Sequence, residues 1–486
     1  MTDKVVIRRL PTGVPGLDAL LAGGLAEFSF NLIAGVPGSG KTTLAHQIMF
    51  SLANPDRRAI FFTVLGEPPL KMLRYQQQYS FFDATKFNES IRFINLGDEI
   101  VCGDYNRVLD RIVEEVERFG PALVMVDSFR SVVQSARHAG KDEMDLQHFV
   151  QRLGMLLTTW QATTFLIGEY TTTESEANPI FTVADGILWM AQSVERNSMV
   201  RKIQIMKMRG HATIPGLHTF RISDDGVQIF PRAIVEVQTP PDKATGGPAI
   251  APRRLSMGVP GLDELMGGGL PAGYSLLVAG PSGSGKSQLA AAFLAEGARV
   301  GEKGIIAAFE RTPARSRKVR LDELIANGDV GVIDTRALDL SSDETLSSLA
   351  TMIDRTGATR VVIDSLSGFE LALSPSFRED FRESLYRMIA VLTAKGVAVM
   401  MISELEDRYN DLRFSPYGAA FLTDAIIVQR YVELKGELRR VMAVVKIRNS
   451  PHSHELRPYV ITEAGIEIGK ATPGMDALLT GHPRLA

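Results

Sequence analysis

Two glycine-rich segments in this 486-residue sequence carry the residue types that bind phosphate. Both fit the pattern Gly-x-x-x-x-Gly-Lys-Ser/Thr, and they span residues 35–42 and 280–287. Glycine lets a backbone wrap closely round an anion, in conformations that a Cβ atom would forbid. The amide groups of such a loop, and the positive end of the helix that follows, then point at the phosphates. The two segments therefore predict two sites for the phosphates of a nucleotide.

The side chains of the two loops have distinct expected roles. Lys41 and Lys286 would reach the β- and γ-phosphates, and Thr42 and Ser287 would offer a hydroxyl to Mg²⁺. The residues expected to contact the nucleotide in these segments are Gly35, Pro37, Gly38, Ser39, Gly40, Lys41, Thr42 and Thr43 in the first copy, and Gly280, Ser282, Gly283, Ser284, Gly285, Lys286, Ser287 and Gln288 in the second.

Each loop lies between an apolar run and a helical pattern. The apolar runs are residues 28–34 and 274–279, and the helical patterns are residues 43–49 and 288–294. This strand–loop–helix order is the context that the motif requires. A glycine-rich turn that matches by chance is the alternative, and two copies in the same context argue against it.

The domain around each loop occurs twice. The segment at residues 10–18 ends in Gly-Val-Pro-Gly-Leu-Asp, and so does the segment at residues 255–263. The same offset of 245 residues separates the two loop lysines. This period is too long for a solenoid repeat and indicates a duplicated domain. We expect a first domain over residues 1–237, a Pro/Gly-rich linker over 238–253, a second domain over 254–470 and a short tail over 471–486.

Alternating patterns predict the fold class of both domains. Apolar strand patterns occur at residues 59–64, 122–127 and 163–169 in the first copy, and at 304–309, 360–364 and 398–404 in the second. Helical stretches separate these strand patterns. This alternation predicts an α/β fold, in which a mostly parallel twisted sheet is flanked by helices.

Four carboxylates are candidates for metal binding and for water activation. Asp127 and Asp364 end apolar strands, where a P-loop domain holds Mg²⁺ directly or through water. An aspartate that merely begins a turn is the alternative, and the upstream loops favour the metal role. Glu67 and Glu310 lie just after the strand that follows the P-loop helix, and they could orient and deprotonate water. An exposed loop carboxylate remains an equal alternative for both glutamates.

Composition argues against several classes of protein. The sequence is 45% hydrophobic and 22% charged, which is normal for a soluble protein with large cores. Its formal net charge of −3 gives no overall reason to expect a nucleic-acid or membrane binder. Cys102 is the single cysteine, so one chain can form no disulfide, which fits a reducing cytoplasm. No apolar run approaches the ~20 residues of a membrane span, and the first residues lack a signal-peptide pattern. We therefore expect a cytoplasmic protein.

The sequence resembles the KaiC family of RecA-like tandem ATPases over nearly its whole length. The resemblance depends on the repeated Gly-Val-Pro-Gly-Leu-Asp motif, both P-loops, both Asp-Ser strand ends and two Lys-x-Arg pairs. It is most specific in residues 429–434, 436–440 and 445–448. The resemblance implies that each domain binds ATP with Mg²⁺ at a subunit interface. It also implies a homohexamer of two stacked rings, in which Lys207, Arg209, Lys446 and Arg448 reach the neighbouring subunit's γ-phosphate.

Two departures from the family pattern bear on activity. The family has two adjacent catalytic glutamates in each domain, whereas here Gly66 precedes Glu67 and Arg311 follows Glu310. The clock protein of the family also phosphorylates neighbouring Ser and Thr residues in its second domain. Ala420 and Phe421 stand at those positions here and have no hydroxyl, while Ser415 and Thr423 are nearby hydroxyl residues.

Three functions remain open at this point. The first is an ATP-hydrolysing ring protein in signalling, with a signalling protein as partner and a residual serine/threonine autokinase activity. The second is an assembly switch whose first ring binds ATP and hardly hydrolyses it. The third is a RecA-like DNA recombination or helicase motor. Its best basic stretch, residues 311–320, lacks the interleaved aromatic residues that stack on bases.

Overall fold

The chain divides into two compact units, Met1–Arg232 and Ala233–Ala486. The computed structural model describes residues 7–64, 69–101, 104–138, 143–171, 173–174, 178–195, 198–233, 253–309, 319–334, 341–373, 375–378, 380–405, 422–434, 436–463, 465–470, 475–476 and 484–485.

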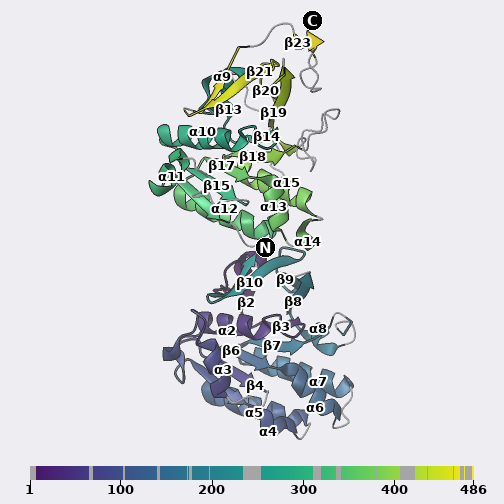
Figure 1. Cartoon of the computed structure of the whole chain (residues 1–486). Coiled ribbons are helices and arrows are strands. Elements are labelled where there is room, and N and C mark those ends of the chain that lie inside the picture. Colours follow the sequence, from purple (N-terminus) through teal and green to yellow (C-terminus); the bar gives the residue numbers. More distant parts are fainter. Residues whose placement is uncertain are drawn as a thin grey trace, which may run out of the picture. The chain divides into compact units, whose positions relative to one another are not determined.

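Nine strands of the described residues form the main sheet of the first unit (Figure 1). They are β3 (Phe30–Gly35), β4 (Ala59–Thr63), β5 (Ile91–Asn95), β6 (Leu123–Asp127), β7 (Thr163–Glu169), β8 (Gly186–Glu195), β9 (Ser198–Met208), β10 (His218–Ser223) and β11 (Gly226–Phe230). Their order across the sheet is β11-β10-β9-β8-β3-β7-β6-β4-β5. The strands from β8 to β5 are parallel, and β9, β10 and β11 extend the sheet by antiparallel pairing.

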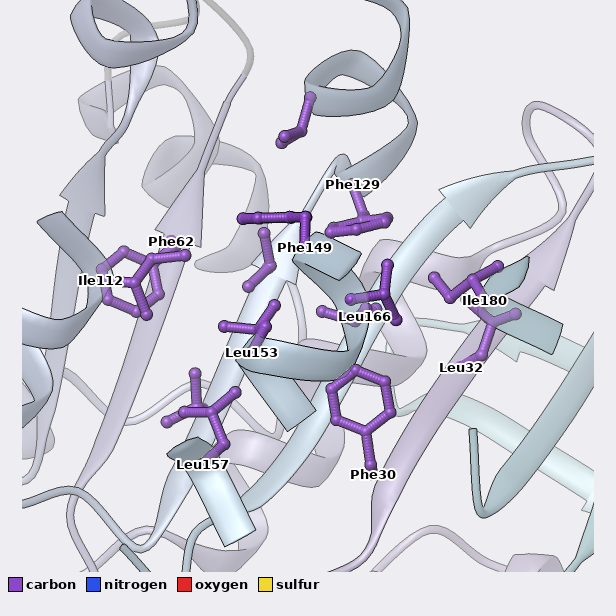
Figure 2. Close-up of a cluster of buried hydrophobic side chains, with 14 of the residues drawn as sticks. Phe30, Leu32, Phe62, Ile112, Phe129, Phe149, Leu153, Leu157, Leu166 and Ile180 are labelled. Atoms are coloured by element: carbon purple, nitrogen blue, oxygen red, sulfur yellow. The ribbon is translucent and has the colours of Figure 1, made fainter. Parts of the chain in front are cut away.

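Helices cover both faces of this sheet. They are α1 (Leu17–Leu20), α2 (Lys41–Leu52), α3 (Pro69–Gln76), α4 (Gly97–Val101), α5 (Tyr105–Phe119), α6 (Phe129–His138), α7 (Glu143–Thr159) and α8 (Pro179–Val183), with a 3-10 turn at Ala84–Lys86. Because side chains alternate along a strand, Leu32 packs with α5, α6 and α7, while Ile33 packs with α1 and α2. Figure 2 shows Phe149, Leu153 and Leu157 of α7 in the first of these two cores.

The second unit repeats this architecture. Its strands are β14 (Ser275–Gly280), β15 (Gly304–Ala308), β16 (Val330–Asp334), β17 (Arg360–Asp364), β18 (Ala398–Glu404), β19 (Ala425–Leu434), β20 (Glu437–Ile447), β21 (Arg457–Thr462) and β22 (Gly465–Ile468). Their order is β16-β15-β17-β18-β14-β19-β20-β21-β22, the same topology read from the other edge. The helices are α9 (Pro260–Leu265), α10 (Lys286–Arg299), α11 (Val319–Ala326), α12 (Ser342–Thr356), α13 (Leu366–Ala372), α14 (Pro375–Arg378) and α15 (Phe381–Ala394).

Three short antiparallel pairs complete the described strands. They are β1 (Arg9–Leu10) with β2 (Leu25–Ala26), β12 (Arg254–Leu255) with β13 (Leu270–Pro271), and β23 (Met475–Asp476) with β24 (Arg484–Leu485). The two mostly parallel, helix-flanked sheets confirm the predicted fold of two tandem RecA-like α/β domains. Within the described parts of the chain, no helix is both long and apolar enough to span a bilayer.

The repeated Gly-Val-Pro-Gly-Leu-Asp motif has a structural role in both units. Asp18 accepts hydrogen bonds of 2.7 Å from the backbone N and the Oγ1 of Thr12. In the second unit, Asp263 accepts bonds from Ser256 Oγ and Met257 N, at 2.6 and 2.8 Å. Each aspartate therefore fixes the turn before a short helix. That helix packs on the face of the sheet that also carries the P-loop helix.

Candidate functional site

Both predicted loops have a backbone that only glycine adopts readily. Gly38 and Gly40 have φ values of +74° and +96°, and Gly283 and Gly285 have values of +76° and +97°. A Cβ atom at Gly40 would lie only 2.5 Å from Ile222 Cδ1. Each loop ends at the first residue of a helix, so the helix N-terminus faces the concave side of the loop.

The loop lysines lie inside these cradles. Lys41 Nζ donates a 2.8 Å hydrogen bond to Val36 O, and Lys286 Nζ donates bonds of 2.8 Å to the carbonyl oxygens of Gly280 and Pro281. Both lysines are buried. Burial lowers the pKa of Lys41, and the carboxylate of Glu169 is the larger of two nearby charges that oppose this shift. An anion that entered the loop would therefore gain a close and poorly hydrated positive charge.

The predicted metal ligands of the first unit are in direct contact. Thr42 Oγ1 donates a 2.6 Å hydrogen bond to Asp127 Oδ2. Burial raises the pKa of Asp127 to about 6, while the hydrogen bond from Thr42 and the charge of Lys41 act in the opposite direction. A hydroxyl and a buried carboxylate form the oxygen-rich donor pair that Mg²⁺ takes beside phosphates.

The second unit places its own aspartate at the same position in the sheet. Asp364 of β17 is paired with Ala308 of β15, just as Asp127 of β6 is paired with Thr63 of β4. In both units the peptide bond after the aspartate is cis. The matching strand pairing makes β6 and β17 structural counterparts in the two units.

A cavity of about 590 Å³ joins the loop and the aspartate of the first unit. Its lining includes six residues that the sequence predicts for nucleotide or metal: Gly38, Gly40, Lys41, Thr42, Thr43 and Asp127. The cavity lies at the carboxyl ends of β3, β6 and β7, which is where open parallel sheets bind ligands. Ser39 Oγ is also buried, and it finds no hydrogen-bond partner among the described residues. The site therefore fits a nucleotide with its metal ion.

The structure adds residues that the sequence reading did not select. Glu169, Arg130, Arg201 and Tyr79 also line the cavity. The position of Glu169 has a visible signal, because it ends the strand pattern at residues 163–169, as Glu404 ends its counterpart at 398–404. Arg201 has no comparable local pattern, since antiparallel strand pairing brings it to the cavity.

The basic pair of the first unit lies away from its own loop. Lys207 is paired with Ile187 near the start of β8, whereas Met190 of β8 lies beside Gly35 at the P-loop end. Ile187 and Met190 are three residues apart, so about 10 Å along β8 separates the position of Lys207 from the P-loop end of the sheet. Lys207 Nζ donates to Thr182 O at 2.8 Å.

The other members of the two pairs have matching contacts. Arg209 contacts Asp185 at 3.0 Å, and Arg448 contacts Asp424 at 3.5 Å. Lys446 Nζ donates a 2.6 Å hydrogen bond to the backbone oxygen of the residue before Asp424. Burial lowers the pKa of Lys446, as it does that of Lys207. Lys446 is paired with Ile426, which lies beside Leu277, three residues before the end of β14 at Gly280. Both pairs therefore lie at the end of the sheet opposite the P-loop of their own unit.

Several predicted residues lie outside the described parts of the chain. They are Glu67, Glu310, Arg311, Ser415, Ala420 and Phe421, together with residues 312–318 of the basic stretch. Thr423 is described and is completely buried.

Comparison with known proteins agrees with the geometry of the site. The sequence model of the family described as "ATPase: KaiC" matches residues 10–234 and 255–473. The circadian clock oscillator protein KaiC of Picosynechococcus is 26% identical to the chain, over 98% of the chain and 92% of the relative. KaiC of Prochlorococcus marinus is also 26% identical, over 99% and 97%. KaiC 1 of Synechocystis is 26% identical, over 98% and 92%. Because the family model covers both units and most of the sequence, the chain belongs to the KaiC ATPase family.

Proposed function

We propose that this protein hydrolyses ATP in both units and that its sites are completed between copies of the chain. The main support is one arrangement in the first unit. Lys41, Thr42 and Asp127 meet in a single cavity, while Lys207 and Arg209 lie at the opposite edge of the same sheet. The first three residues suit a nucleotide of their own unit, and the basic pair suits a nucleotide held by a neighbour.

The residues of the chain divide the work. The loop amides and Lys41 would hold the β- and γ-phosphates and neutralise their charge. Thr42 and Asp127 would hold Mg²⁺, and the ion would supply further charge neutralisation at the phosphates. Lys207 and Arg209 of an adjoining copy would stabilise the charge that develops on the transferred phosphoryl group. Lys286, Ser287, Asp364, Lys446 and Arg448 would take these roles in the second unit.

The proposed assembly is a cytoplasmic homohexamer of two stacked rings that acts in signalling through a protein partner. The relatives named as circadian clock oscillator proteins support this proposal, as does the separation between each loop and its basic pair. In the second unit Glu310 would orient water, or accept a hydroxyl proton if an autokinase activity is present. Ala420 and Phe421 offer no acceptor hydroxyl for such a step.

Matched lysine variants test the proposal. Lys41→Ala removes one proposed phosphate contact in the first unit, and Lys286→Ala removes one in the second. We expect each variant to lose the ATP hydrolysis of its own unit. The molar mass in solution, with and without Mg²⁺ and ATP, reports assembly for the same samples. Unchanged hydrolysis in the double variant, or no binding of ATP to the native protein in calorimetry, would contradict the proposal.

A second function follows if the first unit binds ATP without hydrolysing it. Gly66 stands beside Glu67, where the family pattern has a glutamate pair, and this change favours a first ring that serves assembly. In that case Lys41→Ala would abolish assembly, and Lys286→Ala would abolish the turnover of ATP. Equal loss of turnover in both variants would exclude this division.

A further inference from the structure

Glu169 occupies a distinctive position in the first unit. β7 lies between β3, which leads into the P-loop, and β6, which ends at Asp127 (Figure 1). Glu169 is the last residue of β7 and is paired with Gly35, the last residue of β3. Glu169 therefore lies between the P-loop and the aspartate proposed to bind the metal, and it lines the cavity that contains both.

The Glu169 carboxylate is available for chemistry at this point. The residue is exposed, and among the described residues no hydrogen bond or ion pair engages its side-chain oxygens. By contrast, Asp127 is buried and accepts the hydroxyl of Thr42. Burial lowers the pKa of Lys41 and raises that of Asp127, and the charge of Glu169 opposes the first shift and adds to the second. The charge of Glu169 therefore acts at the centre of the site.

A clamp fixes the backbone that carries Glu169. Arg130, on α6 just after Asp127, donates from Nη1 to the backbone oxygen of Glu169. Its guanidinium also forms a two-pronged pair with Glu174, with both N–O distances at 2.9 Å. Glu174 in turn accepts from the N and Oγ1 of Thr171, at 2.9 and 3.0 Å. Two parallel charge-assisted bonds hold such a pair in one geometry.

This clamp belongs to the first unit. The residue three positions after the strand-ending aspartate is Arg130 in the first copy and Ser367 in the second. Both copies depart from the family's glutamate pair, with Gly66 in the first copy and Arg311 in the second. Among the described residues, the first unit therefore has an arginine that fixes the backbone of a further carboxylate residue, Glu169, at the phosphate end of the sheet.

We propose that Glu169 orients and deprotonates the attacking water in the first unit, with Arg130 and Glu174 as positioning residues. The proposal rests on the ATP hydrolysis proposed above. The water oxygen would form a bond to the γ-phosphorus, and its proton would pass to the Glu169 carboxylate. The bond from the γ-phosphorus to the bridging oxygen would break, and ADP would leave with the electron pair. General-base help of this kind contributes about 10²- to 10⁴-fold.

The test uses the full chain with Lys286→Ala, so that the remaining hydrolysis belongs to the first unit. In that background, Glu169→Gln keeps the size of the side chain and removes its charge. We expect kcat to fall about 10²-fold or more while the affinity for ATP, measured by calorimetry, changes by less than about threefold. Glu169→Asp should recover part of the rate. Glu404→Gln is the matched control and should leave first-unit hydrolysis unchanged.

A second variant tests the clamp. Arg130→Met removes both the bond to the Glu169 backbone and the pair with Glu174, and it keeps an unbranched side chain in place of the arginine stem. We expect kcat to fall about 10-fold, with ATP affinity retained, because a carboxylate displaced by about 1 Å loses much of its rate advantage. Thermal unfolding of each variant checks that the first unit remains folded.

Each remaining outcome contradicts the inference at a different level. If the Glu169→Gln protein hydrolyses ATP at the native rate, or loses ATP affinity in proportion to its rate, Glu169 is not the base. Glu169 would then act as a counter-charge for Lys41. If Glu67→Gln alone abolishes hydrolysis, the base is Glu67. If the Lys286→Ala protein binds ATP without hydrolysing it, both first-unit hydrolysis and the role of Glu169 are wrong. If it binds no ATP, the proposed function itself fails.

Discussion

Thr42 and Asp127 lie 85 positions apart in the sequence, yet the Thr42 hydroxyl donates a 2.6 Å hydrogen bond to the Asp127 carboxylate. Thr42 is the second residue of α2, which follows β3 and the P-loop. Asp127 ends β6, which lies two strands from β3 in the sheet. The folded chain alone therefore brings the two expected metal ligands together.

Loss of the Thr42 hydroxyl should weaken the response to magnesium. Thr42→Val keeps the shape of the side chain but removes its donor and its metal-binding oxygen. A hydrogen bond to a charged group contributes about 1.5–3 kcal/mol, so we expect first-unit hydrolysis to need roughly 10- to 100-fold more Mg²⁺. A titration of Mg²⁺ in the Lys286→Ala background measures this change. Thr42→Ser is the control and should respond as the native residue does, since Ser287 holds the same position in the second unit.

The charge of Asp127 should make the nucleotide-free protein less stable near neutral pH. Burial raises the pKa of Asp127 from 3.8 to about 6. A raised pKa gives stability that is fully present below about 3.8 and is lost as the pH rises through about 6. At pH 7.5 the buried charge therefore costs up to about 3 kcal/mol, and Asp127→Asn should remove this cost. The variant should unfold at a higher temperature than the native protein.

The same variant should lose this advantage in acid. By pH 5 about half of the difference in stability should have disappeared, since the native Asp127 is then largely protonated. Calorimetric unfolding at pH 7.5 and at pH 5, without nucleotide, gives both values. A difference that does not change between the two pH values would show that burial of this carboxylate is not its cause.

Mixtures of defective subunits should regain activity. One variant carries Lys41→Ala, and the other carries Lys207→Ala with Arg209→Ala, both in the Lys286→Ala background. Neither should hydrolyse ATP in its first unit when alone. In an equal mixture, about a quarter of the interfaces would join an intact loop to an intact basic pair, because a head-to-tail contact uses different surfaces of the two copies. If mixing restores nothing although the subunits exchange, the basic pair does not act between copies.

The buried ion pair of the second unit should be sensitive to loss of one partner. Arg360 is 1% exposed, and its Nε donates to Glu302 at 2.7 Å, while Nη1 donates to two backbone carbonyls. Glu302→Ala leaves the arginine uncompensated and should cost about 3–5 kcal/mol in the free energy of unfolding.

The first unit supplies the control for this ion pair. Leu123 begins β6 where Arg360 begins β17, so this position of the fold accepts an apolar side chain. A protein with both Arg360→Leu and Glu302→Met should therefore recover part of the lost stability. Denaturant unfolding of the full chain compares the two proteins. A double variant as unstable as Glu302→Ala would show that the carbonyl contacts of Arg360 matter more than its charge.

The sequence predicted the fold and the centre of the site because both depend on local patterns. The loop glycines, Lys41, Thr42 and Asp127 each lie within or beside a recognisable strand or helix pattern, and parallel strands carry such residues to one edge of a sheet. The duplicated motif allowed the same reasoning for the second unit.

The rest of the site depends on contacts that no local pattern encodes. Arg130 reaches the backbone of Glu169, 39 positions away, through the packing of a helix on the sheet. Arg201 reaches the cavity through a hairpin whose register contains an irregularity between Ile187 and Leu188. Side chains of this kind can be placed only when the tertiary structure is known.

The placement of Lys207 and Arg209 has a consequence for small numbers of copies. If these cations serve a neighbour, a single subunit contains every part of a catalytic centre but cannot assemble one. In an open row of subunits, the P-loop at one end would lack a neighbour's basic pair, and the basic pair at the other end would contact no nucleotide. Only closure of the row into a circle would remove both defects. Dilution should then abolish ATP hydrolysis by dissociating the closed assemblies, while each polypeptide stays fully folded.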